Sequence, residues 1–175
     1  MALIYMRKGV MDDLDAIMEI IDSAKALLKA DGSTQWQDGT PNREILLNDL
    51  RHGYVRVLVV DGKIAGTATL MTQKDPHYTK IYDGEWDDNK DRYATIHRIA
   101  LSTKYRGMKL SKFFFSNLIS DTYAQEIYHM RIDTHELNLR MQKLVSYFGF
   151  NYRGIIYVKT GSEGKRLAYE LNMVQ

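Results

Sequence analysis

The segment from residue 97 to residue 111 brings together side chains that bind anions or move protons. His97 lies in a run of alternating β-forming residues, and Arg106-Gly107 follows just before an apolar helical pattern. A histidine changes its charge near neutral pH, which suits a general base. A helix that begins directly after such a turn presents N–H groups without intrahelical acceptors, and these groups bind phosphate. The segment predicts a proton-transfer group beside an anion-binding turn.

Both features also have a purely structural interpretation. A histidine inside a sheet is often a hydrogen-bonded core residue, and a single glycine turn between a strand and a helix is a weak signal. If the turn does bind phosphate, the N–H groups of residues 107 to 111 hold it and Arg106 adds charge, with Lys104 and Lys112 as further sources of charge.

Hydrophobic periodicity predicts the elements that position this segment. Apolar residues at three- and four-residue spacing predict helices from a capping Asp12 or Asp13 to about Gly32, from the capping Asn42 to Leu50, from about Gly107 toward Tyr123, and around Met141–Phe148. Strand patterns cover Leu3–Arg7, Val55–Val60, Ile64–Met71, Ala94–Leu101, Arg131–Thr134, Tyr152–Val158 and Arg166–Leu171. The order β-α-α-β-β-β-α-β-α-β-β predicts an α/β fold of the mixed α+β kind, a mixed sheet with helices on both faces.

Two of these elements carry detailed expectations. In the strand before the turn, simple alternation predicts one face with Ile96, Arg98 and Ala100 and another with Thr95, His97, Ile99 and Leu101. In the helix after it, the apolar face is predicted to hold Leu110, Phe113, Phe114 and Leu118. Residues 72–93 are mostly polar and are expected to form a long loop.

Length and composition narrow the class of protein. A chain of 175 residues with 45% hydrophobic residues is expected to form one domain over residues 1–175. It has no cysteine, which fits a reducing compartment, and the cytoplasm is the default location. A net charge of +2 without a basic stripe argues against nucleic-acid binding. No apolar run approaches the roughly 18 residues needed to cross a bilayer, so no membrane association is expected.

The stretch Ile96–Ser111, IHRIALSTKYRGMKLS, resembles the acetyl-CoA-binding motif of the GNAT superfamily of N-acetyltransferases, in which a strand leads through Arg/Gln-x-x-Gly-x-Gly/Ala into a helix. A second segment is similar to later parts of that family: RIDTH at 131–135, then Asn138, then YFGF at 147–150. The predicted element order resembles the GNAT fold over nearly the whole chain. The resemblance implies a largely antiparallel central sheet.

The resemblance also implies a reaction and its binding residues. A GNAT enzyme takes acetyl-CoA as co-substrate and acetylates an amine of a small molecule or peptide. The strand before the turn splays from its neighbour in this family, which leaves the backbone of Ile99 and Leu101 free to pair with the pantetheine arm. The residues implied to bind CoA are Ile99, Ala100, Leu101, Arg106, Gly107, Met108, Lys109, Leu110, Ser111 and Asn138. Asn138 is equally compatible with a helix cap.

The catalytic residues carry over only in part. His97 is the first choice for the base, since some arylalkylamine-acetylating relatives use a histidine there. The tyrosine that often serves the leaving thiolate is replaced by Val145. Tyr147 is the substitute candidate, but it lies about 200° further around the helix and is expected to project with Arg140 and Lys143. Lys109 and Ser111 stand where the family pattern has small residues; Lys109 either crowds the phosphate or adds charge to its site.

The remaining expectations concern the acceptor and the rival functions. Trp36, Glu85 and Trp86 lie in two loops expected near the acceptor, where they either bind the amine or cover the core. His135-Glu136 lacks a third ligand at metal spacing, so no metal is predicted. The alternative function is a non-catalytic acyl-CoA-binding or regulatory module. The edges of the terminal hairpin are compatible with a homodimer.

Overall fold

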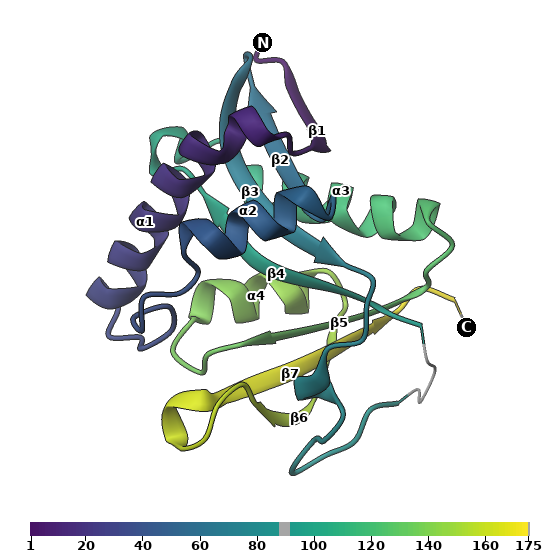
Figure 1. Ribbon diagram of the computed structural model, residues 1–175. Helices are drawn as coiled ribbons and strands as arrows, with labels where there is room; N and C mark the ends of the chain where they lie inside the picture. Colours follow the sequence, from purple (N-terminus) through teal and green to yellow (C-terminus); the bar gives the residue numbers. More distant parts are fainter. Residues whose placement is uncertain (88–91, 175) are drawn as a thin grey trace.

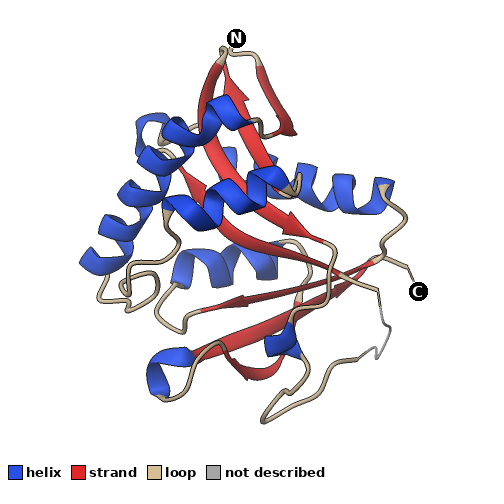
Figure 2. Ribbon diagram, in the orientation of Figure 1, coloured by secondary structure: helices blue, strands red, loops and turns tan. Residues whose placement is uncertain are grey.

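A computed structural model describes residues 1–87 and 92–174 of the chain. In this part of the molecule one sheet lies between two layers of helices (Figure 1, Figure 2). In chain order the strands are β1 (Ile4–Lys8), β2 (Val55–Val60), β3 (Lys63–Met71), β4 (Ala94–Leu101), β5 (His129–Thr134), β6 (Asn151–Tyr157) and β7 (Lys165–Asn172). The α-helices are α1 (Leu14–Ala30), α2 (Arg43–Arg51), α3 (Leu110–Ala124) and α4 (Leu139–Tyr147).

The sheet is mixed and largely antiparallel. Its strand order is β1-β2-β3-β4-β5-β7-β6, and of these neighbours only β4 and β5 run parallel, within the described residues. The predicted fold class and the predicted order of strands and α-helices are therefore confirmed. The Asp61-Gly62 turn that joins β2 to β3 is also confirmed, with both residues in the left-handed region that such a turn requires.

Helices cover both faces of this sheet. α1 and α2 pack against Val55, Val57 and Val59 of β2, whereas α3 and α4 pack on the opposite face, against Leu58 and Val60. Burial on both sides explains why β2 reads as an almost unbroken apolar run. The longest described helix is α1, with 17 residues. Among the described residues, no helix has the length and apolarity to cross a membrane.

The starts of the first two helices differ in how well the sequence predicts them. Asn42 caps α2 as expected, since its Oδ1 accepts the N–H of Ile45 at 2.9 Å. The expectation that Asp12 or Asp13 caps α1 is wrong, because no side-chain cap bond forms there. The Asp13 carboxylate instead accepts hydrogen bonds from both terminal nitrogens of Arg7, at 2.7 and 2.9 Å. A charged donor forms a stronger hydrogen bond with a carboxylate than a helix N–H group does.

In α3 the buried face is shifted relative to the predicted one. Leu110, Phe114 and Leu118 are buried as expected, but Phe113 is 39% exposed and Phe115 is fully buried in its place. Phe115 packs its ring against Phe148 and Phe150, with centroid separations of 5.2 and 5.8 Å. An aromatic cluster with the end of α4 therefore decides which neighbouring phenylalanine is in the core.

A β-bulge interrupts the alternation of β4. Thr69 of β3 pairs with His97 and Thr67 pairs with Ala100, so Arg98 and Ile99 together oppose one residue. Arg98 has a φ of 53°, in the left-handed region. After the bulge, Ala100 packs with the α1 and α2 cluster, whereas Ile96 packs with α3. The prediction that Ile96 and Ala100 share a face is wrong, because an arginine gives no sequence signal for a left-handed bulge.

The strands β4 and β5 diverge soon after they meet. Their parallel pairing comprises Ala94 with Met130 and Thr95 with Arg131. Beyond Thr95 the two ribbons separate, and the gap widens toward the α3 end of β4 (Figure 1). The splay that the GNAT resemblance implied is confirmed.

The two edges of the sheet are β1 and β6. Part of the β6 edge is covered, because the backbone of Tyr82 exchanges two 2.8 Å hydrogen bonds with Ile155. A second contact follows from Gly84, where a Cβ atom would lie 1.9 Å from the carbonyl oxygen of Arg153. The loop after β3 thus occupies part of the edge that the sequence offered to a homodimer, and the dimer stays a prediction.

Candidate active site

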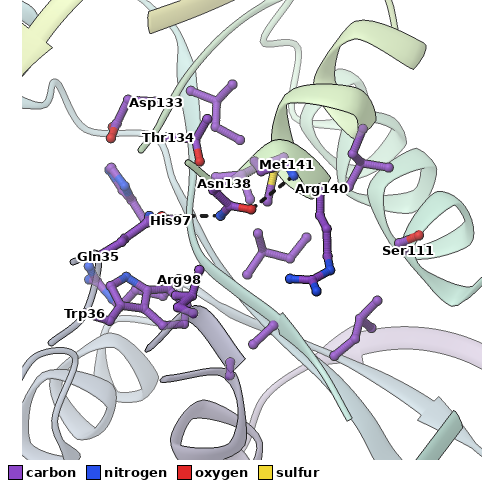
Figure 3. A pocket seen from close by; sticks show the side chains of 18 of the residues that line it. Gln35, Trp36, His97, Arg98, Ser111, Asp133, Thr134, Asn138, Arg140 and Met141 are labelled. Carbon is purple, nitrogen blue, oxygen red and sulfur yellow. Dashed lines mark hydrogen bonds between the residues drawn. The ribbon is translucent and has the colours of Figure 1, made fainter. Parts of the chain in front are cut away.

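A cavity of about 1420 Å³ occupies the splay between β4 and β5. Its walls come from the second half of β4, the turn into α3, the end of β5, the start of α4 and the loop between α1 and α2 (Figure 3). The same cavity reaches the N-terminus of α3 and the side chain of His97. One open space therefore connects the predicted anion-binding turn with the predicted base.

The turn from β4 into α3 has the conformation that an anion site needs. Gly107 has a φ of 85° and Lys109 a φ of 55°, so the backbone turns sharply just before the helix begins. Leu110, Ser111 and Lys112 open the helix, so their N–H groups have no intrahelical acceptors. These residues and Arg106 line the cavity.

Met108 departs from the other predicted members of this turn. Its N–H donates to the carbonyl oxygen of Tyr105 at 3.3 Å, its side chain is 39% exposed, and it is not among the residues that line the cavity. The N–H of Met108 therefore serves the turn itself. Gly107 and residues 109–111 are left as the predicted donors to a phosphate.

Tyr147 lies at the α3 end of the cavity. Its ring is 62% exposed and carries the Lys112 ammonium 3.4 Å from its centroid. The ring of Phe148 packs edge-on against it. Because Lys112 belongs to the first turn of α3, Tyr147 stands beside the predicted phosphate site. The expectation that it projects with Arg140 and Lys143, away from the core, is confirmed.

Asn138 combines a helix cap with a position at the cavity wall. Its Oδ1 accepts the N–H of Met141 at 3.2 Å, and its Nδ2 donates to Oε1 of Gln35 at 3.3 Å, across the cavity mouth (Figure 3). The cap interpretation is confirmed. Asn138 also lines the cavity, so its predicted contact with CoA remains open to it.

Further contacts hold the loop between α1 and α2 against the start of α4. Arg140 forms an ion pair with Asp31. Nε2 of His135 lies 3.2 Å from Oγ1 of Thr34, and Nδ1 of His135 accepts the N–H of Leu137 at 3.1 Å. Both nitrogens of His135 are thus committed to structural bonds. This loop forms a fixed wall of the cavity.

His97 pairs with an aspartate of the loop that follows β3. Nε2 of His97 lies 3.0 Å from Oδ2 of Asp75, and the His97 side chain is one-fifth exposed. When the ring is neutral, this bond places its proton on Nε2, so Nδ1 carries the lone pair. Both residues line the cavity. The arrangement is that of a base whose tautomer is set by a carboxylate.

Asp75 is itself held by the loop after β3. It caps a short 3₁₀ turn (Pro76–Tyr78), where its Oδ1 accepts the N–H of His77 at 2.9 Å, and its own N–H donates to the Tyr93 hydroxyl. Burial disfavours the ionised carboxyl, but the bonds from His97 and His77 outweigh it and hold the pKa of Asp75 well below its usual range. Asp75 is therefore a carboxylate at neutral pH.

Tyr78 joins this pair to a second carboxylate. Its hydroxyl donates to Oδ2 of Asp133 at 2.6 Å, and its ring centroid lies 6.3 Å from that of His97. Burial, together with the Asp133 charge, raises the pKa of Tyr78 well above its ordinary value. The phenol keeps its proton and acts as a fixed donor to Asp133.

Comparison with known proteins decides the family. A family model described as the acetyltransferase (GNAT) family matches residues 16–150. The chain belongs to the GNAT acetyltransferase family. Comparison with curated proteins gives no match.

Solved structures described as acetyltransferases are similar along nearly the whole chain. A GNAT-family acetyltransferase from Streptococcus agalactiae 2603 is 34% identical, with 98% of this chain and 96% of that chain covered and a TM-score of 0.90. A putative acetyltransferase from Staphylococcus aureus Mu50 is 27% identical, with coverages of 97% and 99% and a TM-score of 0.70. YncA, a putative acetyltransferase from Salmonella typhimurium solved with acetyl-CoA, shares the fold at 18% identity, with coverages of 98% and 95% and a TM-score of 0.67.

Against the GNAT pattern, the structure brings together most of the residues that the sequence singled out. The predicted CoA-binding residues that line the cavity are Ile99, Ala100, Leu101, Arg106, Gly107, Lys109, Leu110, Ser111 and Asn138. Val145, at the GNAT tyrosine position, is fully buried in the core. Its side chain carries no proton to donate, and Tyr147 contacts Lys112 rather than the His97 end.

The predicted acceptor residues divide into one that lines the cavity and two that do not. Trp36 lines it, and its backbone is in the left-handed region with a φ of 65°. Glu85 is exposed and Trp86 is buried, and neither is among the lining residues. The indole Nε1 of Trp86 donates to the Tyr78 carbonyl oxygen at 2.9 Å, so Trp86 takes the core-covering role that the sequence left open.

Charged residues of this GNAT cavity that sequence reasoning did not single out include Asp75, Asp133 and Arg166. Asp75 lies in a polar loop, and the other two lie inside strands. Asp133 is part of the RIDTH segment that carried the resemblance, which is the signal that pointed nearest to it. Nothing in the spacing of these residues indicates that they share one cavity.

Proposed function

We propose that this GNAT protein transfers the acetyl group of acetyl-CoA to the amine of a small molecule or peptide. One observation carries the proposal: a histidine–aspartate pair, His97 with Asp75, lines the same cavity as the N-terminus of α3. The first group suits the removal of a proton, and the second suits the binding of a pyrophosphate.

The residues present fit acetyl-CoA. The left-handed Gly107 and the opening turn of α3 line the cavity, where N–H groups without intrahelical acceptors suit a phosphate, and Arg106, Lys109 and Lys112 supply positive charge. Among the described residues, the splay of β4 from β5 leaves the second half of β4 unpaired on its β5 side, while β3 pairs with its other side. These residues would hold the pyrophosphate and the pantetheine arm. When bound, acetyl-CoA supplies an acetyl group activated as a thioester.

The reaction requires one proton acceptor from the protein. Transfer forms a C–N bond and breaks the C–S bond, and the acceptor ammonium loses two protons: one goes to a base of the protein, and the other passes to the departing thiolate, directly or through water, to give the CoA thiol. His97 is this base and accepts the proton at Nδ1, because Asp75 keeps the other ring nitrogen protonated. The charge that develops on the imidazole is stabilised by the neighbouring carboxylate, as in other histidine–carboxylate pairs.

We assign no acid role to Tyr147. Its ring packs under the Lys112 ammonium, at the phosphate end of the cavity, whereas the contacts of His97 are with Asp75 and Tyr78. The proposal instead gives Tyr147 a binding role beside the α3 N-terminus. A CoA thiolate is a good leaving group, so transfer proceeds without a dedicated acid.

Mass spectrometry tests the proposal directly. The protein is incubated with acetyl-CoA and a panel of amino acids, polyamines, arylalkylamines and short peptides, and both free CoA and acetylated acceptor are quantified. We expect stoichiometric formation of the two products with at least one amine. Calorimetry with CoA, run on the same preparation, shows whether the cofactor site is formed.

The alternative, a non-catalytic acyl-CoA-binding module, predicts a different pair of results. CoA would bind in the calorimeter, but no amine in the panel would release free CoA above the hydrolysis of a protein-free control. That combination would remove the enzymatic proposal and leave the binding site.

A further inference from the structure

We infer that the acceptor carries a carboxylate as well as its amine, as a free α-amino acid does. This inference rests on the acetyl transfer proposed above and narrows its acceptor. It comes from two oppositely charged side chains, Arg166 and Asp133, that face the cavity with unused hydrogen-bonding capacity.

Arg166 is a buried cation without a carboxylate partner among the described residues. It is 7% exposed and lines the cavity, and its hydrogen bonds run from Nη1 to the backbone carbonyl oxygens of Glu163 and Lys165, at 2.8 Å each. Other largely buried arginines behave differently: Arg56 pairs with Asp121 and Arg98 pairs with Asp49.

A buried guanidinium normally has a partner, because an unpaired buried charge is costly. Burial lowers the pKa of Arg166, while Asp133 and Asp38 act in the opposite direction from a distance. An arginine nevertheless keeps its charge in proteins. The remaining donors, Nε and Nη2, match the geometry of a carboxylate that enters through the cavity.

Asp133 supplies the complementary charge on the neighbouring strand. Oδ2 accepts the Tyr78 hydroxyl at 2.6 Å, and no cationic side chain among the described residues forms an ion pair with this carboxylate. Ala168 of β7 pairs with Asp133 of β5, so Arg166 is its diagonal neighbour on the same face. Such neighbours lie about 7–8 Å apart between Cα atoms. A small zwitterion spans such a gap between a carboxylate and a guanidinium.

The charges disfavour other acceptors. A polyamine would bring a second ammonium toward Arg166, and an amine without an anionic group would leave the guanidinium unpaired when it occupies the cavity. Lys159, a further cation that lines the cavity, already pairs with Asp38 and Glu163, at 3.6 and 3.4 Å. The capacity to bind a carboxylate next to Asp133 therefore lies with Arg166.

The amine end of such an acceptor would lie beside the base. Tyr78 contacts both groups concerned, because its hydroxyl binds Asp133 and its ring packs near His97. Asp133 projects from β5 into the cavity in the same region as His97 (Figure 3). An ammonium attracted by Asp133 would thus surrender its proton close to Nδ1 of His97.

The test compares matched acceptors. Each L-amino acid is assayed against its α-amide and its decarboxylated amine, for instance tyrosine against tyrosinamide and tyramine, with release of free CoA as the readout. We expect at least one amino acid whose kcat/KM exceeds that of both analogues by about 10- to 100-fold, as charge-assisted hydrogen bonds imply. An amide or amine that is acetylated as efficiently as its acid would overturn the inference and leave the acetyl transfer intact.

Variants of Arg166 then test whether this residue causes the preference for the acid over its amide. Arg166→Gln should raise KM for the acid and leave KM for the amide unchanged, so that their kcat/KM values differ by less than about threefold. Arg166→Lys should restore part of the preference for the acid. Lys165→Gln removes a neighbouring cation that pairs with Glu136 outside the cavity, and should keep the full preference. A preference that survives in Arg166→Gln would contradict the assignment.

Two further measurements separate a loss of the acid preference from a loss of folding and from a failure of acetyl transfer. Thermal unfolding of each variant shows that loss of preference does not reflect loss of fold. If no amine releases CoA, acetyl transfer fails, and calorimetric titration of the CoA-loaded protein with the same amino acids and amides decides the inference by itself. Equal or undetectable affinity for acid and amide would then overturn it.

Discussion

Nε2 of His97 lies 3.0 Å from Oδ2 of Asp75, while the other oxygen of the same carboxylate accepts the N–H of His77 at 2.9 Å. The carboxylate is thus fixed from two sides, and its position determines the orientation of the His97 ring. This relationship joins β4 to the loop after β3, two segments between which the sequence suggested no contact.

The first prediction concerns the tautomer of His97. Asp75→Asn replaces one acceptor oxygen with an NH₂ group, which favours the tautomer that has its lone pair on Nε2. We expect kcat to fall by about 100-fold while KM for acetyl-CoA stays within about twofold. The control is Asp83→Asn, the same substitution in the same loop at an exposed site away from the cavity. Steady-state kinetics that show equal activities for the two variants would contradict the role of Asp75.

The second prediction concerns the bulge in β4. Arg98 donates to both carboxylate oxygens of Asp49, at 2.8 and 3.0 Å, and Asp49 is 3% exposed. Asp49→Ala leaves the Arg98 charge half-buried and unpaired, so we expect the free energy of unfolding to fall by about 3 kcal/mol in urea.

The matched control for that variant is Asp15→Ala. Asp15 forms an ion pair with Arg43 in which both side chains are more than half exposed. Because water and salt screen such a pair, its loss should cost less than about 1 kcal/mol. Similar costs for the two variants would show that the Arg98–Asp49 pair does not anchor the bulge.

The third prediction concerns the turn before α3. Gly107 has a φ of 85°, and a Cβ atom there would meet no atom within 4 Å, so a side chain acts through backbone strain rather than through a clash. Gly107→Val should displace the N–H groups of the turn and weaken CoA binding by about 10-fold or more. Calorimetry measures the affinity.

Gly32 offers a matched control for the same substitution. Its φ is 78°, its surroundings are equally open, and it lies at the end of α1, outside the cavity. Gly32→Val should lower stability to a similar extent but leave CoA affinity unchanged. An unaltered affinity in Gly107→Val would refute the placement of the phosphate site.

The fourth prediction concerns pH and His135. Burial, with the Arg166 charge nearby, holds the pKa of His135 below its ordinary value, so the folded protein keeps this ring neutral. The unfolded chain then binds the proton more readily. The stabilising contribution is therefore complete above about pH 6.5 and is lost as pH falls from there through the lower, folded-state pKa.

Urea unfolding of the wild type and His135→Asn between pH 5 and pH 8 measures this effect. The variant should lose part of the decline in stability that the wild type shows on acidification. His52→Asn serves as the control, because His52 is exposed at the end of α2. A pH dependence in His135→Asn that matches the wild type would exclude His135 as the source.

The sequence was most informative where local pattern decides structure. Helical spacing located α1, the Asn42 side chain located the start of α2, and Arg106-Gly107 located the turn before α3. These features depend on interactions within a few residues, so one chain segment suffices to predict them. The position of Arg98 in a left-handed bulge is different, because the buried Asp49 carboxylate that holds it comes from another element.

The acceptor end of the site lay beyond sequence reasoning for the same reason. Asp75, Asp133 and Arg166 come from a loop and two strands, and only the assembled sheet brings them to one cavity. Conversely, Trp86 looked like an acceptor residue because of its type and its polar surroundings. The structure buries its ring under the Arg131 guanidinium, 4.3 Å from the centroid.

The central claim is that His97 removes the proton from the acceptor amine, and the pH profile of kcat/KM in His97→Ala tests it most directly. With any amine that the mass-spectrometric panel identifies, wild-type kcat/KM should rise with pH, because a general base must be deprotonated to accept the proton. In His97→Ala we predict a loss of about 10²–10⁴-fold and a flatter pH profile. A variant that keeps the wild-type rate and profile would contradict the account.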